Sequence, residues 1–128
     1  MELKTTGYYS EMPHAQEGAP SMKEYLNKEE PEMVEAICRY LREGTVLGVS
    51  PGETTDVIEP EKGFSGTATA YTDGKWVWPG DLVYYVETYL LKIPDEFLQT
   101  MIENGWENPI KDMDFSQETI VVNGIRLF

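Results

Sequence analysis

The side chains that most often carry nucleophilic and acid–base chemistry are scarce in this sequence. It contains a single histidine, His14, and a single cysteine, Cys38. Nothing in the sequence around His14 would orient it as a base or a metal ligand, so we expect a solvated side chain. Cys38 falls on the apolar stripe of a predicted helix, which indicates a buried, unreactive thiol. Catalysis by a Ser-His-Asp or a Cys-His arrangement is therefore not expected.

Carboxylates, by contrast, are abundant: the 128 residues include 23 Asp and Glu against 10 Lys and Arg. Paired carboxylates can carry out acid–base or glycosidic chemistry without a histidine. The sequence does not show whether any pair converges in a cleft, and a solvated acidic face is the favoured interpretation. No EF-hand loop and no phosphate-binding glycine pattern is present, so we predict no metal and no cofactor. The candidate acids are Asp56, Glu59, Glu61, Asp112 and Asp114.

The densest unusual segment is residues 71–82, YTDGKWVWPGDL. Trp76 and Trp78 fall on one face of a predicted strand, and Val77 faces the other way. In the favoured interpretation the two rings seal the sheet against the next helix. The alternative is an aromatic binding face rimmed by acids, because Trp and Tyr are enriched at interface hot spots. The residues predicted to contact a partner are Asp56, Glu59, Glu61, Tyr71, Asp73, Trp76, Trp78 and Tyr84.

The formal net charge of −13 restricts the expected partners. A field of this sign disfavours nucleic acid and anionic membranes, and it favours a basic protein surface or a cation. We expect no membrane-spanning segment, because no apolar run approaches the roughly 18 residues needed to cross a bilayer. We also expect no secretory signal. A single cysteine excludes an intramolecular disulfide and fits a reducing compartment, so the cytoplasm is the expected location.

One folded domain is expected, because 41% of the residues are hydrophobic and the length is near that of a typical domain. Residues 1–20 show no sustained periodicity and are predicted to form an irregular arm ahead of a domain over 21–128. Spacing and capping residues predict helices over 21–26, with Ser21 and Glu24 as a capping box, over 31–43 and 81–90, and from residue 94 to a stop at Gly105. Strands are predicted over 45–49, 56–58, 67–71 and 75–77, with a terminal hairpin over 119–128. The predicted fold class is α+β, a single domain in which an antiparallel sheet has helices packed on one side.

Three segments carry a resemblance to a known class of proteins: residues 71–79 (YTDGKWVWP), 82–86 (LVYYV) and 93–97 (IPDEF), with a weaker match at 21–26 (SMKEYL). They resemble small acidic bacterial proteins, including immunity proteins of polymorphic and contact-dependent toxin systems. The resemblance implies a non-catalytic protein that neutralises a cognate toxin, which in many such systems is a basic nuclease. No binding residue is implied, because the matching segments look architectural.

Two alternatives stay open beside this function. The first is a small carboxylate-dependent hydrolase or carbohydrate-binding protein, which requires a concave pocket beside Trp76 and Trp78 with two converging acids, one of them with a raised pKa. The second is a structural or adaptor protein, which would scatter its acids without a focus. All three functions are compatible with one soluble domain. They differ in where the acidic side chains lie on its surface.

Overall fold

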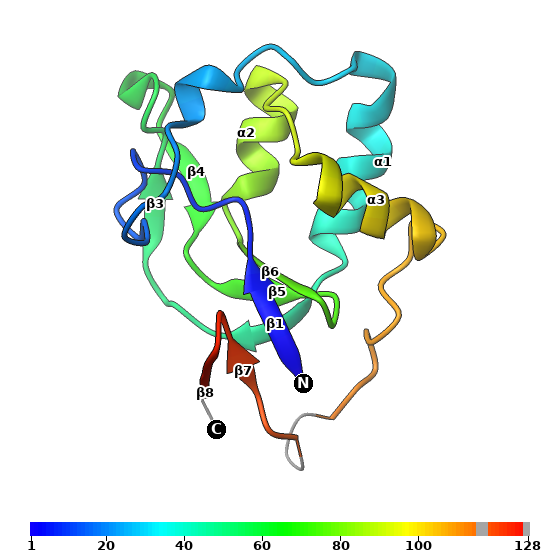
Figure 1. Cartoon of the computed structure of the whole chain (residues 1–128). Coiled ribbons are helices and arrows are strands. Elements are labelled where there is room, and N and C mark those ends of the chain that lie inside the picture. The colour runs from blue at the N-terminus through cyan, green and yellow to red at the C-terminus, as the bar shows by residue number, and fades with distance from the viewer. Residues whose placement is uncertain (115–117, 127–128) are drawn as a thin grey trace.

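The backbone of the computed structural model is organised around a curled, mixed sheet (Figure 1). The structure describes residues 1–114 and 118–126. Within these ranges six strands pair in the order β2-β5-β6-β1-β7-β8, while β3 and β4 form a separate two-stranded ribbon. The pairs β2/β5, β5/β6 and β7/β8 are antiparallel, whereas β1 runs parallel to both β6 and β7. The strands are β1 (Glu2–Thr5), β2 (Thr45–Gly48), β3 (Glu53–Thr55), β4 (Phe64–Thr67), β5 (Ala70–Thr72), β6 (Trp76–Pro79), β7 (Val121–Val122) and β8 (Ile125–Arg126).

The α-helices of the described residues lie on one side of the sheet, as Figure 1 shows. They are α1 (Pro31–Arg42), α2 (Leu82–Tyr89) and α3 (Asp95–Glu103). The short 3-10 helix η1 (Met22–Glu24) precedes α1, and the 3-10 helix η2 (Pro60–Lys62) lies between β3 and β4. Proline at the first position of α1 and Arg39 and Arg42 in its last turn explain why this segment forms the longest helix. The α+β fold class, the single domain and a mostly antiparallel sheet with helices on one side are confirmed.

The two faces of β6 separate the core into two parts. Trp76 and Trp78 point toward the helices, where the Trp78 ring lies 5.2 Å from Phe97 and 6.1 Å from Tyr40, measured between ring centroids. Val77 points to the other face and packs in a smaller cluster with Leu3 and Ile120. The opposite orientation of neighbouring side chains is therefore confirmed, and the two tryptophans are core residues, in agreement with the favoured interpretation.

Cys38 is buried in the larger part of the core, as expected from its place on the apolar stripe of α1. Burial raises the pKa of its thiol to about 11, because the charged thiolate is disfavoured away from water. Such a thiol stays protonated at neutral pH and is a poor nucleophile.

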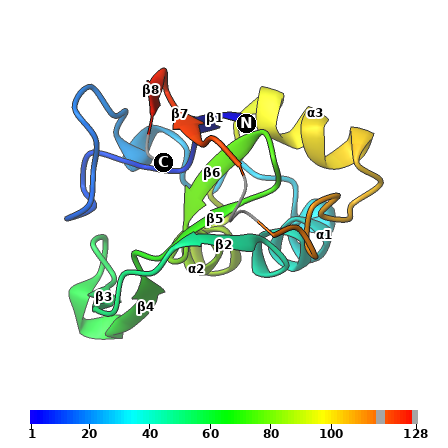
Figure 2. The same cartoon turned by 90° about the horizontal axis from the view of Figure 1, so that it is seen from below.

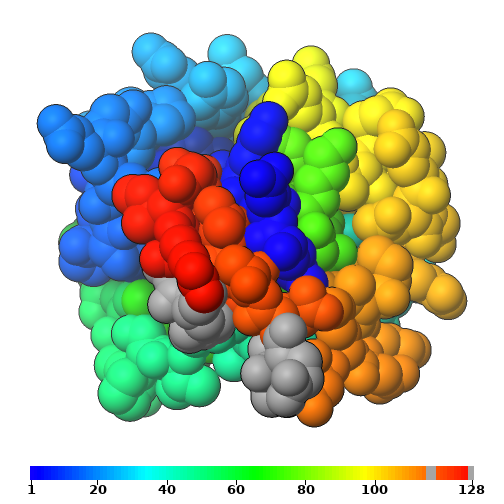
Figure 3. All heavy atoms as spheres, turned by 60° about the horizontal axis from the view of Figure 1, so that its bottom comes forward, coloured from blue at the N-terminus to red at the C-terminus, as the bar shows by residue number. Residues whose placement is uncertain are grey.

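The first residues of the chain differ from the expected irregular arm, because Glu2–Thr5 form β1 inside the sheet. Figure 3 shows this blue strand with the orange and red residues of the C-terminal hairpin on one side and green residues on the other. Leu3 is 2% exposed, and backbone N–H groups on both sides of β1 are paired with β6 and β7. The strand is held by one buried leucine and by parallel pairing with two other strands. Neither feature gives a local pattern in the sequence. Residues 6–20, here called the arm, contain no helix or strand.

Two other segments also differ from the expectation. The predicted strand over 56–58 is a turn, because the Asp56 side chain accepts the backbone N–H groups of Ile58 and Glu59, both at 2.8 Å. The predicted helix over 21–26 is shorter, and the carboxylate that caps it comes from the arm. Glu11 accepts the backbone N–H of Met22 at 2.8 Å and the Ser21 hydroxyl at 2.5 Å, a role that the capping box had given to Glu24.

The predicted hairpin turns are confirmed. Gly74 adopts a φ of 94° in the turn before β6, and Asn123 and Gly124 adopt φ values of 51° and 82° between β7 and β8. Two successive positive φ values are what a tight two-residue hairpin requires. The last two residues of this predicted hairpin, 127 and 128, lie outside the described residues. Among the helices that the structure describes, none combines the length and the apolar character that crossing a bilayer demands.

Candidate functional site

Four acidic residues gather on the small ribbon and its connecting loop, residues 53–67, here called the acidic lobe. This segment holds Glu53, Asp56, Glu59 and Glu61 against one basic residue, Lys62. It consists of β3, η2 and β4 and stands apart from the main sheet in Figure 2. A two-stranded ribbon is only marginally stable by itself, so its position depends on how it is attached to the rest of the domain.

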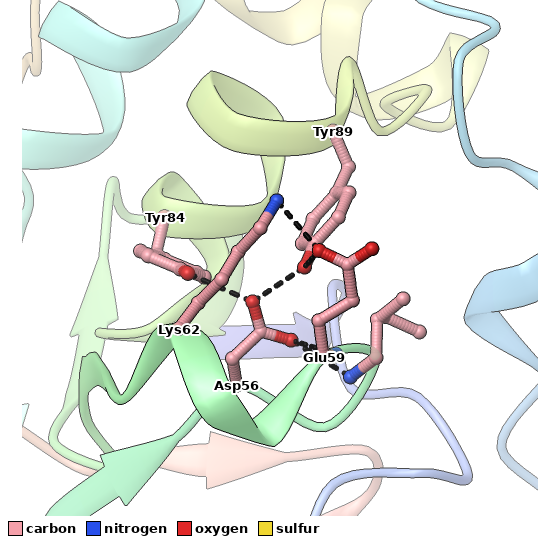
Figure 4. A network of polar contacts seen from close by, with 6 residues as sticks. Asp56, Glu59, Lys62, Tyr84 and Tyr89 are labelled. Carbon is pink, nitrogen blue, oxygen red and sulfur yellow. Dashed lines mark hydrogen bonds and ion pairs between the residues drawn. The ribbon is translucent and has the colours of Figure 1, made fainter.

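Asp56 makes that attachment. Its Oδ2 atom accepts hydrogen bonds from the hydroxyl groups of Tyr84, at 2.8 Å, and Tyr89, at 2.5 Å, both on α2 (Figure 4). Its Oδ1 atom accepts the two backbone N–H groups of the turn described above. With 1% of its surface exposed and four donors, this carboxylate joins the lobe to α2 and shapes the turn at the same time.

The balance of burial and hydrogen bonding determines the charge of Asp56. Burial by itself raises the pKa of the carboxyl, but the hydrogen bonds from Tyr89, the Glu59 N–H, Tyr84 and the Ile58 N–H outweigh it and hold the pKa below its usual value. Burial and the neighbouring carboxylate in turn raise the pKa of the Tyr84 and Tyr89 hydroxyls. The network therefore consists of an ionised acid and neutral phenols at neutral pH.

Further polar contacts fix the two strands of the lobe. The Tyr85 hydroxyl accepts the backbone N–H of Val57 at 3.1 Å and lies 3.5 Å from the carbonyl oxygen of Thr55. Within the ribbon, the Thr54 and Ser65 hydroxyls share a buried hydrogen bond of 2.8 Å. Three tyrosines of α2, Tyr84, Tyr85 and Tyr89, thus hold the lobe through their hydroxyl groups.

The outer surface of the lobe is charged and carries one large apolar side chain. Glu59 pairs with Lys62 at 2.8 Å, and both side chains are 44% exposed; the Lys62 ammonium also lies 4.6 Å from the centroid of the Tyr89 ring. Glu53 and Glu61 are exposed. Phe64 is 60% exposed, which is unusual for a phenylalanine in a short strand. The lobe presents solvent-facing carboxylates and an aromatic ring on a fixed support.

The structure brings together only part of the predicted partner-binding set. Asp56, Glu59 and Tyr84 meet in one network, and Glu61 is on the same lobe. Asp73 is 2% exposed and instead holds the next hairpin, where it accepts the Tyr40 hydroxyl at 2.6 Å and two backbone N–H groups. A surface role for Asp73 would require opening this hairpin.

The remaining three predicted residues are aromatic and take no part in the hydrogen-bond network of Asp56. Trp78 is 1% exposed and donates its indole N–H to the Leu41 carbonyl, which leaves no surface for a partner. Tyr71 is half-buried on β5 beside a small hollow of about 150 Å³. Trp76 is 7% exposed, and the uncovered part of its ring faces a larger hollow near α3. The two tryptophans therefore do not form an exposed platform beside the acids.

His14 is not solvated, contrary to expectation. Its Nε2 atom lies 3.3 Å from Oδ1 of Asp81, the residue that precedes α2, and the two side chains are 16% and 1% exposed. The Tyr8 ring meets the imidazole edge-on, with 5.8 Å between centroids. Burial raises the pKa of Asp81, and the nearby His14 opposes that shift. Nothing in the local sequence indicated this pair, because its members are 67 positions apart.

Sequence reasoning missed Tyr89, Lys62 and Phe64 on the acidic lobe. The helical spacing of Tyr85 and Tyr89 is typical of a buried face, and nothing in the sequence shows which acceptors their hydroxyl groups would meet. The candidate acids Asp112 and Asp114 are exposed. Across residues 1–114 and 118–126, no three His, Cys, Asp or Glu side chains come close enough to hold a metal ion.

No family model, no curated protein and no solved structure matches the chain. The function is therefore argued from the geometry of the acidic lobe, together with the charge of the chain.

Proposed function

We propose that this protein is a non-catalytic binding protein that neutralises a basic protein partner, which it contacts through the acidic lobe. The observation that carries the proposal is the exposed ring of Phe64, on a ribbon with exposed carboxylates that α2 holds in place. A fixed aromatic side chain can fill a pocket on a partner at little entropic cost, which is typical of the residues that dominate binding energy.

The charge of the chain supports a basic partner. A net charge of −13 speeds the encounter with a positively charged surface and disfavours neutral or acidic competitors. Glu53 and Glu61 contribute to this field on the lobe itself, whereas Glu59 is partly neutralised by Lys62. We therefore assign the attraction to the carboxylates and the long lifetime of the complex to Phe64.

The resemblance to immunity proteins makes the partner more specific. A basic nuclease toxin needs a positive surface to hold its nucleic acid. An acidic lobe that covers such a surface would block the substrate without any chemistry of its own. The cognate toxin of a neighbouring gene is the partner that this proposal names.

A non-catalytic role also agrees with the hydrogen bonding and the ionisation of the Asp56 carboxylate. Asp56 has both oxygen atoms occupied by donors and a lowered pKa, so it has no free position from which to exchange a proton with a substrate. General acids in carboxylate-dependent hydrolases have the opposite property, a raised pKa in an accessible pocket.

The experiment is to measure the affinity and the association rate for the basic protein partner that we propose, by surface plasmon resonance at low and high salt. Phe64→Ala is expected to weaken binding by about 2 kcal/mol or more, and high salt to slow association. Ile102→Ala is the matched control, because Ile102 is also an exposed apolar residue, 47% exposed on α3. Absence of a complex, or equal losses in the two variants, would contradict the proposal.

A further inference from the structure

A second surface has the shape of an elongated trench, made of two adjoining hollows of about 880 Å³ and 430 Å³. The first hollow lies between the arm, η1 and the start of α3, and the second continues along α3. Trp76, Asp95 and Glu96 line both, so the hollows meet at these residues. An elongated depression suits an extended chain better than a compact ligand, whose pockets usually measure about 300–1,000 Å³ in total.

The floor and walls of the first hollow are rich in aromatic and proline surface. Trp76 donates its indole N–H to the Thr100 hydroxyl at 2.9 Å, so it offers the trench an apolar ring without a free donor. Tyr25 is 36% exposed and lies against Tyr9, with 6.2 Å between ring centroids. Pro20 and Pro94, both exposed, complete this surface. Grooves of this composition bind extended polyproline-type segments, which lose little entropy on binding.

The charges around the first hollow favour a positive occupant. Lys92 is already compensated, because its ammonium lies 3.3 Å from Asp95 and 3.9 Å from Glu29. Glu17, Glu24 and Glu96 line the hollow and form no side-chain ion pair with another described residue. They outnumber Lys28, which also lines the first hollow without such a pair. The second hollow adds Lys4 and Lys75 as well as Glu103, so the preference for a positive occupant belongs to the first hollow. A guanidinium or ammonium group entering the hollow would meet these uncompensated carboxylates.

The arm that forms one wall is fixed at three points. Glu11 caps η1, and His14 pairs with Asp81 at the start of α2. Gly7, with a φ of 77°, packs so closely on Leu82 that a Cβ atom there would lie 2.6 Å from the leucine side chain. The wall is therefore in place before a ligand arrives, which lowers the cost of binding.

We propose that this trench binds an extended, proline-containing peptide segment that carries arginine or lysine side chains. The aromatic floor contacts the prolines, and Glu24 and Glu96 bind the basic side chains. The inference does not rest on the proposed function of the acidic lobe: the segment can belong to the same partner or to another protein.

The test uses peptides of about nine residues as probes, long enough to follow the trench at about 3.1 Å per residue. A labelled peptide of three Pro-Pro-Arg repeats is titrated with the intact protein and followed by fluorescence polarisation. The comparison peptides are three Pro-Pro-Glu repeats and three Gly-Ser-Arg repeats, which change the charge and the backbone preference separately. A soluble oligosaccharide of similar length tests the competing class of extended ligand.

Three variants locate the binding. Tyr25→Ala removes part of the floor and Glu96→Lys reverses a charge in the first turn of α3. Glu32→Lys is the matched control, because Glu32 is also an exposed acid in the first turn of a helix, α1, and does not line the trench.

We expect the Pro-Pro-Arg peptide to bind best, and Tyr25→Ala and Glu96→Lys each to weaken it by about tenfold, with Glu32→Lys unchanged. Equal weakening by Glu32→Lys would show general attraction to an acidic protein and would overturn the proposal. Failure of the Pro-Pro-Arg peptide to bind, or binding of the oligosaccharide alone, would overturn it as well. If Phe64→Ala lost binding of the basic protein partner at the lobe but still bound the peptide, the two surfaces would be shown to act independently.

Discussion

Two segments without a place in the main sheet, the acidic lobe and the arm, are both attached to α2 through a buried aspartate, yet the two attachments differ in kind. Asp56 receives four hydrogen bonds and has a lowered pKa. Asp81 has a raised pKa, because burial outweighs the nearby His14 and a hydrogen bond with the Thr54 side chain. Its Oδ1 atom lies 3.3 Å from the His14 imidazole and has no hydrogen bond among the described residues.

The difference shows how strongly the attachment of each segment depends on pH. A buried carboxylate with all its donors in place stabilises the ionised form and fixes its surroundings. A buried carboxylate whose pKa is raised depends on its own protonation, because burial disfavours its charged form. We therefore interpret the attachment of the lobe as complete at neutral pH, and we expect one of the three contacts of the arm, the one with Asp81, to vary with the protonation of Asp81.

Removal of the better-satisfied aspartate has the largest expected effect. Asp56→Ala leaves two phenol hydroxyls and two backbone N–H groups without their acceptor, and we expect a loss of about 3 kcal/mol in the free energy of unfolding. Denaturant unfolding measures it. Glu61→Ala, which removes an exposed acid of the same lobe, serves as the control and should stay within about 0.5 kcal/mol of the wild type. Similar values for the two variants would show that Asp56 does not hold the lobe.

The second variant tests the weaker attachment. His14→Ala removes the imidazole that lies beside the buried Asp81 carboxyl, and we expect a loss of about 1–2 kcal/mol in the free energy of unfolding. Adding Asp81→Asn to this variant should recover part of the loss, because the unpaired charge disappears with it. No recovery in a double-mutant cycle would mean that His14 acts by packing against Tyr8 and not through its charge.

The two aspartates should respond to pH in opposite directions. The pKa of Asp56 is lower in the folded chain than in the unfolded one, so its contribution is complete above the unfolded pKa and is lost as the pH falls through the folded pKa. The pKa of Asp81 is higher in the folded chain, so its contribution is present below the unfolded pKa and is lost as the pH rises through the folded pKa.

As the pH falls, the free energy of unfolding of the wild type should thus approach that of Asp56→Asn. Over the same range it should rise relative to that of Asp81→Asn. Unfolding experiments on the three proteins across the acidic range follow both differences. If both differences moved the same way with pH, the two carboxylates would not differ as described.

The smallest effect is expected at the surface of the lobe. Lys62→Ala removes the exposed ion pair with Glu59 and the contact with the Tyr89 ring, and such pairs contribute little because water screens them. The midpoint of denaturant unfolding should stay within experimental error of the wild type. A clear loss would mean that the Asp56 network extends to the lobe surface.

Elements with strong local signals were predictable from the sequence. Pro31 and Gly44 bracket a run with helical spacing, and the observed α1 spans Pro31–Arg42. The Asp-Gly and Asn-Gly turns are equally local, because the conformation they require suits few other residues. By contrast, β1 owes its place to partners more than 70 residues away, and the cap of η1 comes from Glu11 in the arm.

The candidate site was predictable only as separate residues. Asp56, Glu59 and Tyr84 were among the candidates, but the Asp56 network joins positions 28 and 33 residues apart, and no local pattern shows which carboxylates converge. His14 shows the same limit, since the fold places an apparently solvated side chain against a buried acid. The shared face of Trp76 and Trp78 was predictable because alternation along a strand is a local property, whereas alternation alone did not decide whether that face is buried.

The most direct test of the central claim is amide hydrogen exchange of the protein, free and bound to the basic protein partner that we propose. We predict that binding slows exchange across residues 53–67, most strongly next to Phe64, and that Phe64→Ala abolishes this protection. Protection confined to the arm and α3 would place the partner in the trench. In that case, or if the lobe exchanged at the same rate in both states, the claim that the acidic lobe binds the partner would be wrong.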